Sequence, residues 1–174
     1  TGMPKIAKRT HFNEVFNVWA MEQFAPELCK ARNTFFCGLP LFHTNAKLIA
    51  GLMPVANGGH ILLASPAGFR GEGVVSNFWS LAERFKVVGF SGVPTVYSAL
   101  LEQPQNSYDL SALKVGLCGA APMPVGVFNK FEKETGLRIM EGYGLTEGTV
   151  VSSVNPLHRE HPRIGSIGIR IPHQ

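Results

Sequence analysis

Hydrophobic positions along the chain fall into short apolar runs that alternate with segments of helical periodicity. Runs typical of buried strands cover 34–39, 60–64, 86–90, 113–118 and 138–140, and a further run covers 149–154. Segments with an apolar face at helical spacing cover 11–29, 46–55, 74–85, 96–101 and 124–135. Such alternation is typical of βαβ units with right-handed crossovers. The pattern predicts an α/β fold in one domain, with a mostly parallel sheet flanked by helices.

Glycine and proline mark several of the predicted boundaries. Gly58 and Gly59 follow the helix predicted at 46–55, and Gly136 follows the one at 124–135, where a left-handed residue commonly ends a helix. Pro94 stands where the first turn of a helix tolerates proline. These positions support the predicted order of elements.

Four loops that follow predicted strands hold small, aromatic and polar residues: 40–44, 91–95, 119–122 and 142–147. Ligands of open α/β sheets bind outside the carboxyl ends of the strands. We therefore expect the four loops to lie on one rim of the sheet and to form one site.

The stretch Glu141-Gly-Tyr-Gly-Leu-Thr-Glu147 is chemically the richest of these loops. Gly142 and Gly144 allow a tight turn and a close approach to a ligand. Tyr143 offers a flat face, Thr146 a hydroxyl for a phosphate oxygen, and Glu147 a hard oxygen ligand for Mg²⁺. The alternative is an ordinary turn into a helix, with Thr146 as its N-cap.

Three further segments offer weaker signals. The segment 1–5, Thr-Gly-Met-Pro-Lys, has the composition of a phosphate-binding turn or of a terminal tail. The segment 119–122, Gly-Ala-Ala-Pro, could carry a planar ring or form a tight junction, and His43 could border a substrate or be structural. The 158–161 cluster, His-Arg-Glu-His, is interpreted as solvated surface because structural zinc normally takes four protein ligands.

Charge and cysteine content narrow the function classes. Sixteen Lys and Arg against twelve Asp and Glu give a net charge of +4, which suits an anionic ligand. No Lys/Arg run indicates a nucleic-acid surface. Three cysteines without a C-x-x-C pattern favour a reducing, cytoplasmic compartment. No apolar stretch approaches the roughly 20 residues that span a bilayer.

Taken together, six segments in order resemble the adenylate-forming (AMP-binding) superfamily, and most of all its acyl-CoA synthetases. Residues 1–5 resemble T-G-x-P-K, residues 40–43 resemble P-x-F-H, and residues 93–95 resemble V-P-T. Residues 119–122 resemble G-[AG]-A-P, residues 143–147 resemble Y-G-x-T-E, and residues 165–168 resemble G-S-x-G. The resemblance covers essentially the whole chain, and Y-G-x-T-E with its ordered neighbours is its most specific part.

The resemblance implies a role for each matching residue. Gly119, Ala120 and Ala121 would line one side of an adenine, and Tyr143 would pack on the other side, within a nucleotide site that also includes Pro122, Glu141, Gly142 and Gly144. Thr146 would contact a phosphate and Glu147 would hold Mg²⁺, which makes these two residues, with His43, the expected catalytic group. Thr1, Gly2 and Lys5 would guide the outer phosphates, and His43, Val93 and Gly119 would border the acyl pocket.

The implied activity uses ATP, Mg²⁺ and CoA to activate a fatty or aromatic carboxylic acid as an acyl-adenylate and to pass the acyl group to the CoA thiol. Loading of a carrier protein, a luciferase-like oxidation and a non-catalytic nucleotide-binding module are the alternatives. Oligomeric state is left open, and a homo-oligomer is compatible with the sequence.

By the same resemblance, residues 1–174 correspond to a central part of the large N-terminal domain. The family's ribose-binding aspartate, its hinge and the small C-terminal domain with its catalytic lysine have no counterpart in the chain. We therefore expect these 174 residues alone to be inactive as a synthetase.

Overall fold

The computed structural model describes residue 3, residues 5–157 and residues 163–174. These form a seven-stranded sheet in the order β2-β1-β3-β4-β5-β6-β7. The strands from β2 to β5 in this order are parallel, and β6 and β7 continue the sheet in antiparallel pairing. The predicted mostly parallel sheet is confirmed. The strand bounds are Thr34–Cys37 (β1), His60–Leu63 (β2), Val87–Gly92 (β3), Val115–Cys118 (β4), Arg138–Tyr143 (β5), Ser153–Val154 (β6) and Ile169–Arg170 (β7).

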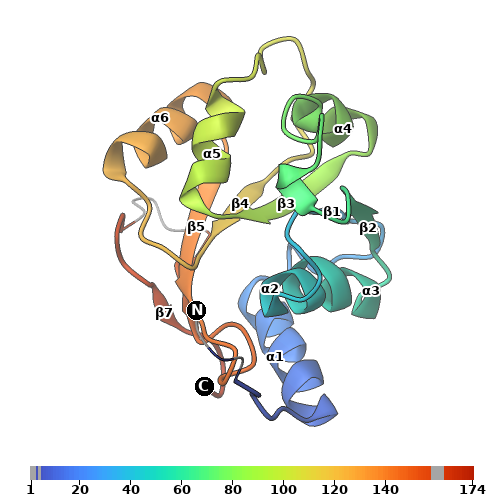
Figure 1. The fold of residues 1–174 in the computed structure, drawn as a ribbon, viewed down its shortest axis with the longest axis vertical. Helices are drawn as coiled ribbons and strands as arrows, with labels where there is room; N and C mark the ends of the chain where they lie inside the picture. Colours follow the sequence, from blue (N-terminus) through green and yellow to red (C-terminus); the bar gives the residue numbers. More distant parts are fainter. Residues whose placement is uncertain (1–2, 4, 158–162) are drawn as a thin grey trace.

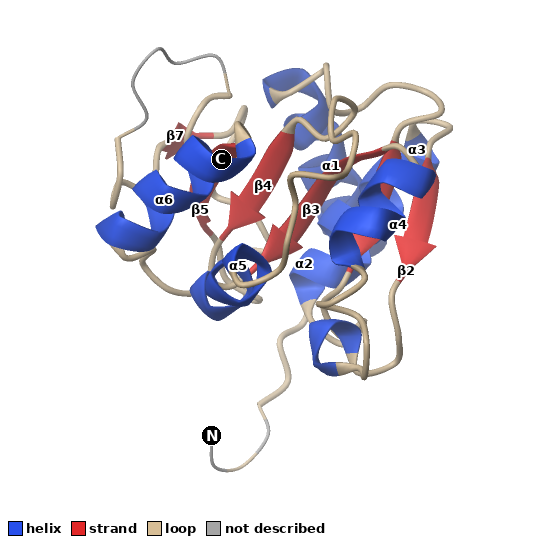
Figure 2. Ribbon diagram, turned by 90° about the horizontal axis from the view of Figure 1, so that it is seen from above, coloured by secondary structure: helices blue, strands red, loops and turns tan. Residues whose placement is uncertain are grey.

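Helices cover both faces of the sheet (Figures 1 and 2). Helices α4, α5 and α6 lie on one face, and α1, α2 and α3 lie on the other. A π-helical turn joins α2 to α3, and a short 3₁₀ turn follows β2. Among the described residues, no helix has both the length and the hydropathy needed to cross a membrane. The bounds are His11–Phe24 (α1), Thr44–Lys47 (α2), Leu48–Leu52 (η1, the π turn), Met53–Ala56 (α3), Gly68–Arg70 (η2, the 3₁₀ turn), Phe78–Arg84 (α4), Pro94–Leu101 (α5) and Val125–Thr135 (α6).

Local sequence signals account for several helix ends. Thr10 accepts a hydrogen bond from the backbone of Asn13, whose side chain accepts one from the Thr10 backbone, so a capping box starts α1. Pro94 is the first residue of α5, as predicted. Gly136 ends α6 with a φ of 70°, a conformation that carries little steric cost for glycine.

Other predicted boundaries were wrong. The helix predicted at 11–29 ends at Phe24, two residues before Pro26, which cannot continue it. The helix predicted at 46–55 starts earlier, at Thr44, and is interrupted by the π turn. The helix predicted at 74–85 begins only at Phe78, after the glycine-rich turns that precede it. The strand predicted at 149–154 is limited to its last two residues, and its first residue, Thr149, has a φ of 80°, outside the β region.

Helix α1 buries only part of the apolar face expected from its helical spacing. Among its apolar residues Val18 is buried, but Val15 and Trp19 are 62% and 40% exposed. Asn17, a polar residue, is only 1% exposed. The apolar spacing of the sequence therefore identified the helix but not its full contact face.

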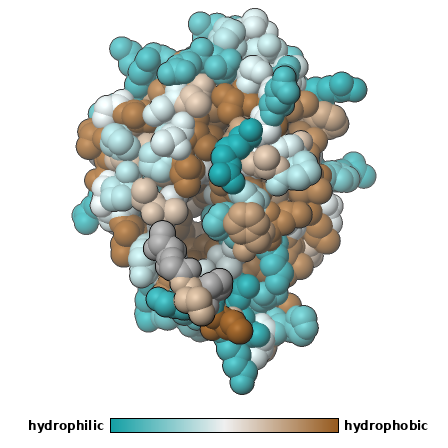
Figure 3. All heavy atoms as spheres, in the orientation of Figure 1, coloured by the Kyte–Doolittle hydropathy of each residue, from teal (hydrophilic) through white to brown (hydrophobic). Residues whose placement is uncertain are grey.

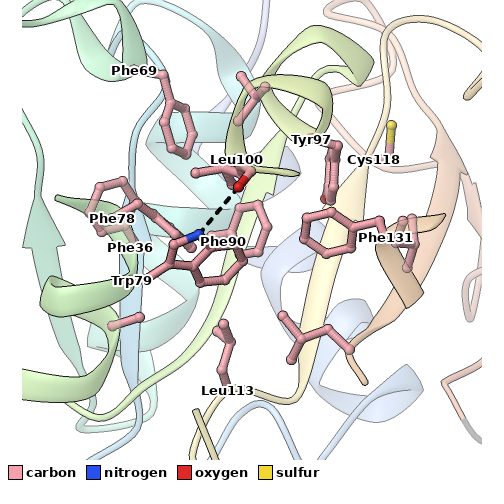
Figure 4. Close-up of a cluster of buried hydrophobic side chains, with 14 of the residues drawn as sticks. Phe36, Phe69, Phe78, Trp79, Phe90, Tyr97, Leu100, Leu113, Cys118 and Phe131 are labelled. Atoms are coloured by element: carbon pink, nitrogen blue, oxygen red, sulfur yellow. Dashed lines mark hydrogen bonds between the residues drawn. The ribbon is translucent and has the colours of Figure 1, made fainter. Parts of the chain in front are cut away.

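Two hydrophobic cores lie on the two faces of the sheet. The core beneath α4, α5 and α6 is rich in aromatic rings, and the indole Nε1 of Trp79 donates a hydrogen bond to the Leu100 carbonyl oxygen at 3.2 Å (Figure 4). The core beneath α1 and η1 is mostly aliphatic and contains several methionines. The aromatic core includes Phe36, Phe69, Phe78, Trp79, Phe90, Tyr97, Phe128 and Phe131.

Candidate functional site

The four loops predicted to share a rim line one cavity of about 490 Å³. Each loop contributes residues from the carboxyl end of its strand, so the predicted convergence is confirmed. The loop residues that line the cavity are Pro40, His43, Thr44, Ser91, Gly92, Val93, Thr95, Gly119, Ala120, Gly142, Tyr143, Gly144, Leu145 and Thr146.

The inner wall of the cavity is apolar. Met21 reaches it from α1, Ile49 from η1 and Met140 from β5, and Val150 and Val154 complete this side. These five residues belong to the aliphatic core. Hydrophobic side chains are exposed over a large part of the face drawn in Figure 3. The cavity can therefore take an apolar group inside and polar groups at its rim.

The two glycines of the 142–147 loop are required because the backbone of residues 150–153 packs directly against them. A Cβ at Gly144 would overlap the carbonyl oxygen of Val150, and one at Gly142 would lie 2.9 Å from the Ser153 carbonyl oxygen. Two turn hydrogen bonds shape the loop, from Gly148 N to Leu145 O at 3.1 Å and from Thr149 N to Thr146 O at 3.2 Å. The expected tight turn is present, and its close approach is to protein backbone.

Thr146 lines the cavity and Glu147 follows it on the exposed part of the loop. The structure shows no ion pair for Glu147 with any described residue, and no cluster of three or more metal-ligating side chains occurs among the residues described. Mg²⁺ is commonly held by one or two carboxylates together with substrate phosphates and water. A single exposed carboxylate next to a cavity-lining threonine fits that arrangement, and it does not fit a cage built from protein ligands alone.

The loop after β4 reaches the cavity through Gly119 and Ala120. A Cβ at Gly119 would lie 3.6 Å from the Gly142 carbonyl oxygen, an ordinary contact, so the fold itself does not require glycine there. Ala120 has a φ of 69°, which is costly for a residue with a Cβ and is often found at ligand sites. Tyr143 is 49% exposed and lines the same cavity. Ala121 and Pro122 are exposed and are not among the lining residues.

The Glu141 carboxylate links two segments by hydrogen bonds to their backbone, one after the 119–122 loop and one at 165–168. Its Oε1 accepts a hydrogen bond from Met123 N at 3.2 Å, and its Oε2 accepts one from Gly165 N at 2.8 Å. The residue is 7% exposed. Burial, and secondarily the charge of Glu141, raises the pKa of the Cys118 thiol to about 12. A nucleotide contact by Glu141 stays a prediction, and these bonds indicate a structural role.

The three residues predicted for an acyl pocket, His43, Val93 and Gly119, all line the cavity. His43 precedes α2, and its ring centroid lies 4.5 Å from that of Phe42. Three polar residues that the sequence analysis did not single out also line the cavity, namely Asn45, Ser153 and the exposed Arg70. Asn45 Oδ1 and Ser153 Oγ are buried and accept or donate no hydrogen bond within the described part of the chain. No sequence pattern distinguished Ser153, whereas Asn45 stands two residues after His43.

The predicted phosphate-guiding segment is only partly described. Lys5 is exposed and does not line the cavity. Thr1 and Gly2 lie outside the described residues, and so does the 158–161 cluster. Their predicted roles stay predictions.

Comparison with known proteins gives a consistent set of relatives. The chain is 42% identical over 177 aligned residues to a marinolic acid–CoA ligase of Pseudoalteromonas sp. (strain SANK 73390), covering 100% of this chain and 27% of the relative. It is 33% identical to a long-chain-fatty-acid–CoA ligase of Yersinia pestis, covering 99% of this chain and 30% of the relative. The chain thus spans about a third or less of the length of these relatives.

Solved structures with 25% sequence identity share the fold. An anthranilate CoA ligase in complex with anthranoyl-AMP superposes with a TM-score of 0.83, covering 98% of this chain and 32% of that one. An O-succinylbenzoate coenzyme A synthetase from Bacillus subtilis, in complex with ATP and a magnesium ion, gives a TM-score of 0.80 and covers 98% and 34%. The model of the family described as AMP-binding enzyme matches residues 1–174, so the chain belongs to that family.

Proposed function

We propose that this chain is part of a carboxylate–CoA ligase, in which it forms the site where a carboxylic acid is activated by ATP as an acyl-adenylate. The observation that carries the proposal is the single cavity, which joins the Gly119–Ala120 and Tyr143–Thr146 rim to an apolar inner wall. The named relatives support it, because they are CoA ligases and one solved relative holds an acyl-adenylate.

The chemistry proposed has two steps. In the first, the acid's carboxylate oxygen attacks the α-phosphorus of ATP, the bond to the β-phosphate oxygen breaks, and pyrophosphate leaves. In the second, the thiol sulfur of CoA attacks the acyl carbon, loses its proton, and displaces AMP. A mixed anhydride of this kind hydrolyses readily, so the apolar wall formed by Met21, Ile49 and Met140 helps by keeping water away.

Each rim residue has a proposed task. Tyr143 and the backbone of Gly119–Ala120 would hold the nucleotide base between them, and the Thr146 hydroxyl would donate a hydrogen bond to a phosphate oxygen. Glu147 would hold Mg²⁺, which when bound neutralises charge on the phosphates. The chain's own contribution is then to hold the carboxylate in line with the phosphate. Such positioning can lower a reaction barrier by several kcal/mol, about 7 or more in favourable cases.

The cavity wall indicates the class of acid. None of the lining residues in the described part of the chain is Asp or Glu, so no carboxylate there would pair with an α-amine. The apolar inner wall favours a fatty or aromatic acid over an amino acid. We also propose a cytoplasmic location, which suits the three free cysteines.

The test is pyrophosphate release by the natural polypeptide that contains these 174 residues. ATP and Mg²⁺ would be supplied with short-chain, medium-chain, long-chain and aromatic acids, each with and without CoA. We expect release that depends on the acid, and formation of the acyl-CoA when CoA is present.

Controls separate this proposal from its alternatives. An amino acid panel should give no release above the rate without acid. Acid-dependent release without acyl-CoA formation would point to another acceptor, with a carrier-protein thiol tested next. ATP binding without release for every acid would contradict the proposal and favour a non-catalytic nucleotide-binding module.

A further inference from the structure

Asn17 is the only buried polar side chain of α1, and it makes two hydrogen bonds to one residue far along the chain. Its Nδ2 donates to the Val151 carbonyl oxygen at 2.8 Å, and its Oδ1 accepts from the Val151 backbone N at 3.2 Å. Both backbone groups of Val151 are therefore satisfied by one side chain that is 1% exposed. A buried amide that pairs with one residue through both its donor and its acceptor fixes the position of the backbone it binds.

Arg9, just before α1, holds the same returning segment at a second point. Its Nη1 donates to the Thr149 carbonyl oxygen at 3.1 Å, and its other terminal nitrogen lies 3.6 Å from a carboxylate oxygen of Glu14. Glu14 in turn pairs with Lys47 of α2 at 2.7 Å. The guanidinium is thus anchored by a charge network between two helices.

The segment held in this way is strained. Thr149 has a φ of 80° and is 7% exposed, and a β-branched residue rarely adopts this conformation. Such a conformation is energetically costly and persists only where the surroundings impose it. The bonds from Arg9 and Asn17 on either side of Val150 supply that restraint.

The restrained segment is directly connected to the proposed phosphate-binding loop. Thr149 N donates to the Thr146 carbonyl oxygen at 3.2 Å, and Ser152 N donates to the Tyr143 carbonyl oxygen at 2.9 Å. The Val150 carbonyl oxygen occupies the space that a Cβ of Gly144 would need. A shift of residues 149–151 would therefore move Tyr143, Gly144 and Thr146 together.

We propose that Asn17 and Arg9 are positioning residues that hold the strained 149–151 segment and thereby set the loop that carries Thr146 and Glu147. The consequence for catalysis rests on the proposed function, whereas the restraint of the loop does not. A misplacement of about 1 Å in such a loop can cost roughly 100-fold in rate.

The experiment compares Asn17→Leu with Asn33→Leu in the natural polypeptide. Asn33 also donates from its side chain to two backbone carbonyls, at 2.9 and 3.3 Å, but these belong to Leu28 and Glu27, away from the cavity. Hydrogen exchange of the backbone amides from 143 to 152 is measured first. We expect Asn17→Leu to speed exchange there by about tenfold or more, and Asn33→Leu to leave these amides within about twofold of wild type.

The second readout is the rate of acid-dependent pyrophosphate release at matched fraction folded. Asn17→Leu should lower kcat by about 10- to 100-fold, with a smaller change in KM for the acid, because Met21, Ile49 and Met140 of the apolar wall lie outside the loosened segment. Adding Thr149→Gly should restore part of both the protection and kcat, since glycine adopts this φ without strain.

The outcomes distinguish the two proposals. Exchange at 143–152 that is no faster in Asn17→Leu than in Asn33→Leu would overturn the positioning inference, whatever the activity. Equal kcat for the two variants would overturn it as well. A wild-type protein that releases no pyrophosphate would contradict the proposed function, and the exchange comparison would still decide the role of Asn17.

Discussion

The two faces of the sheet differ in the side chains that cover them and in how much they contribute to the cavity. The face covered by α4, α5 and α6 is filled with interlocking aromatic rings, such as Phe78 and Phe90, whose centroids are 4.8 Å apart. The face covered by α1 and η1 is aliphatic and lines much of the cavity, with Met21 and Ile49 contributing to both core and wall. The cavity therefore lies mainly on the aliphatic face, called the hollow face below, although Phe69 and Val96 of the aromatic core also line it.

This difference places stability and ligand chemistry in different parts of the molecule. Aromatic side chains bury large areas and gain further from edge-to-face contacts, which suits a rigid support. The hollow face contains the strained Thr149, with its positive φ, and Ser153, whose hydroxyl has no hydrogen-bond partner among the described residues. The Tyr97 hydroxyl of the aromatic face likewise has none in the described part of the chain. Substitutions on the aromatic face should therefore unfold the protein, while those on the hollow face should mainly change function.

The largest expected effect is on stability, from Phe131→Ala. Phe131 is fully buried and contacts the rings of Trp79, Phe90 and Tyr97. Its truncation should lower the free energy of unfolding by about 3–5 kcal/mol. Ile49→Val, on the hollow face, should cost only about 1 kcal/mol and should change the preference among acids. Urea unfolding measures both, and equal losses would break the comparison.

The next effect is on activity, from Gly144→Ala. Because the new Cβ would overlap the Val150 carbonyl oxygen, the loop must move, and pyrophosphate release should fall by about 100-fold. Gly126→Ala is the control, since its Cβ would meet no atom within 4 Å and helix α6 favours alanine. Similar rates for the two variants would show that the loop tolerates displacement.

A smaller effect is expected for Glu147→Gln. The side chain is exposed, so stability should change by less than about 0.5 kcal/mol. Loss of the charged ligand should raise the Mg²⁺ concentration needed for half-maximal release by about tenfold or more. Glu134→Gln, on the outer surface of α6, is the control and should leave the Mg²⁺ titration unchanged. An unchanged titration for Glu147→Gln would remove this residue from the proposed metal site.

The smallest effect is expected at the surface pair Lys86–Asp109, whose charged atoms are 2.8 Å apart. The hydrogen bond from Lys86 holds the pKa of Asp109 well below its usual range. Because the folded pKa is depressed, the pair stabilises the protein above about pH 4 and loses this contribution as the pH falls toward the depressed value. Thermal unfolding of Asp109→Asn should therefore differ slightly from wild type at pH 7 and converge with it at low pH. A difference that grows at low pH would contradict this assignment.

Sequence alone predicted the parts of the site that depend on strand order. The alternation of elements placed the four loops on one rim, and the motif residues His43, Val93, Gly119, Tyr143 and Thr146 all line the cavity. These predictions succeeded because a parallel sheet brings the carboxyl ends of its strands to one edge. They required no knowledge of side-chain packing.

Features that depend on long-range contacts could not be predicted. Asn17 looks like a solvent-facing residue in the sequence, and its partner Val151 is 134 positions away. The turn at Thr149 replaces a predicted strand because Thr149 is held left-handed, which its own β-propensity opposes. The π turn of Leu48–Leu52 likewise follows no local signal. Tertiary contacts, and not the local conformational preferences of the residues, determine each of these three features.

The most direct test of the whole account is hydrogen exchange of the natural polypeptide with and without a non-hydrolysable acyl-adenylate mimic, such as dodecanoyl- or benzoyl-sulfamoyl adenosine. We expect at least one mimic to bind and to slow exchange in the loops at 38–45, 91–96, 117–121 and 142–151, while amides of α4 and α6 on the aromatic face stay unchanged. Binding with protection confined to the aromatic face, or no binding by any acyl variant, would contradict the assignment of the cavity as the site of acid activation.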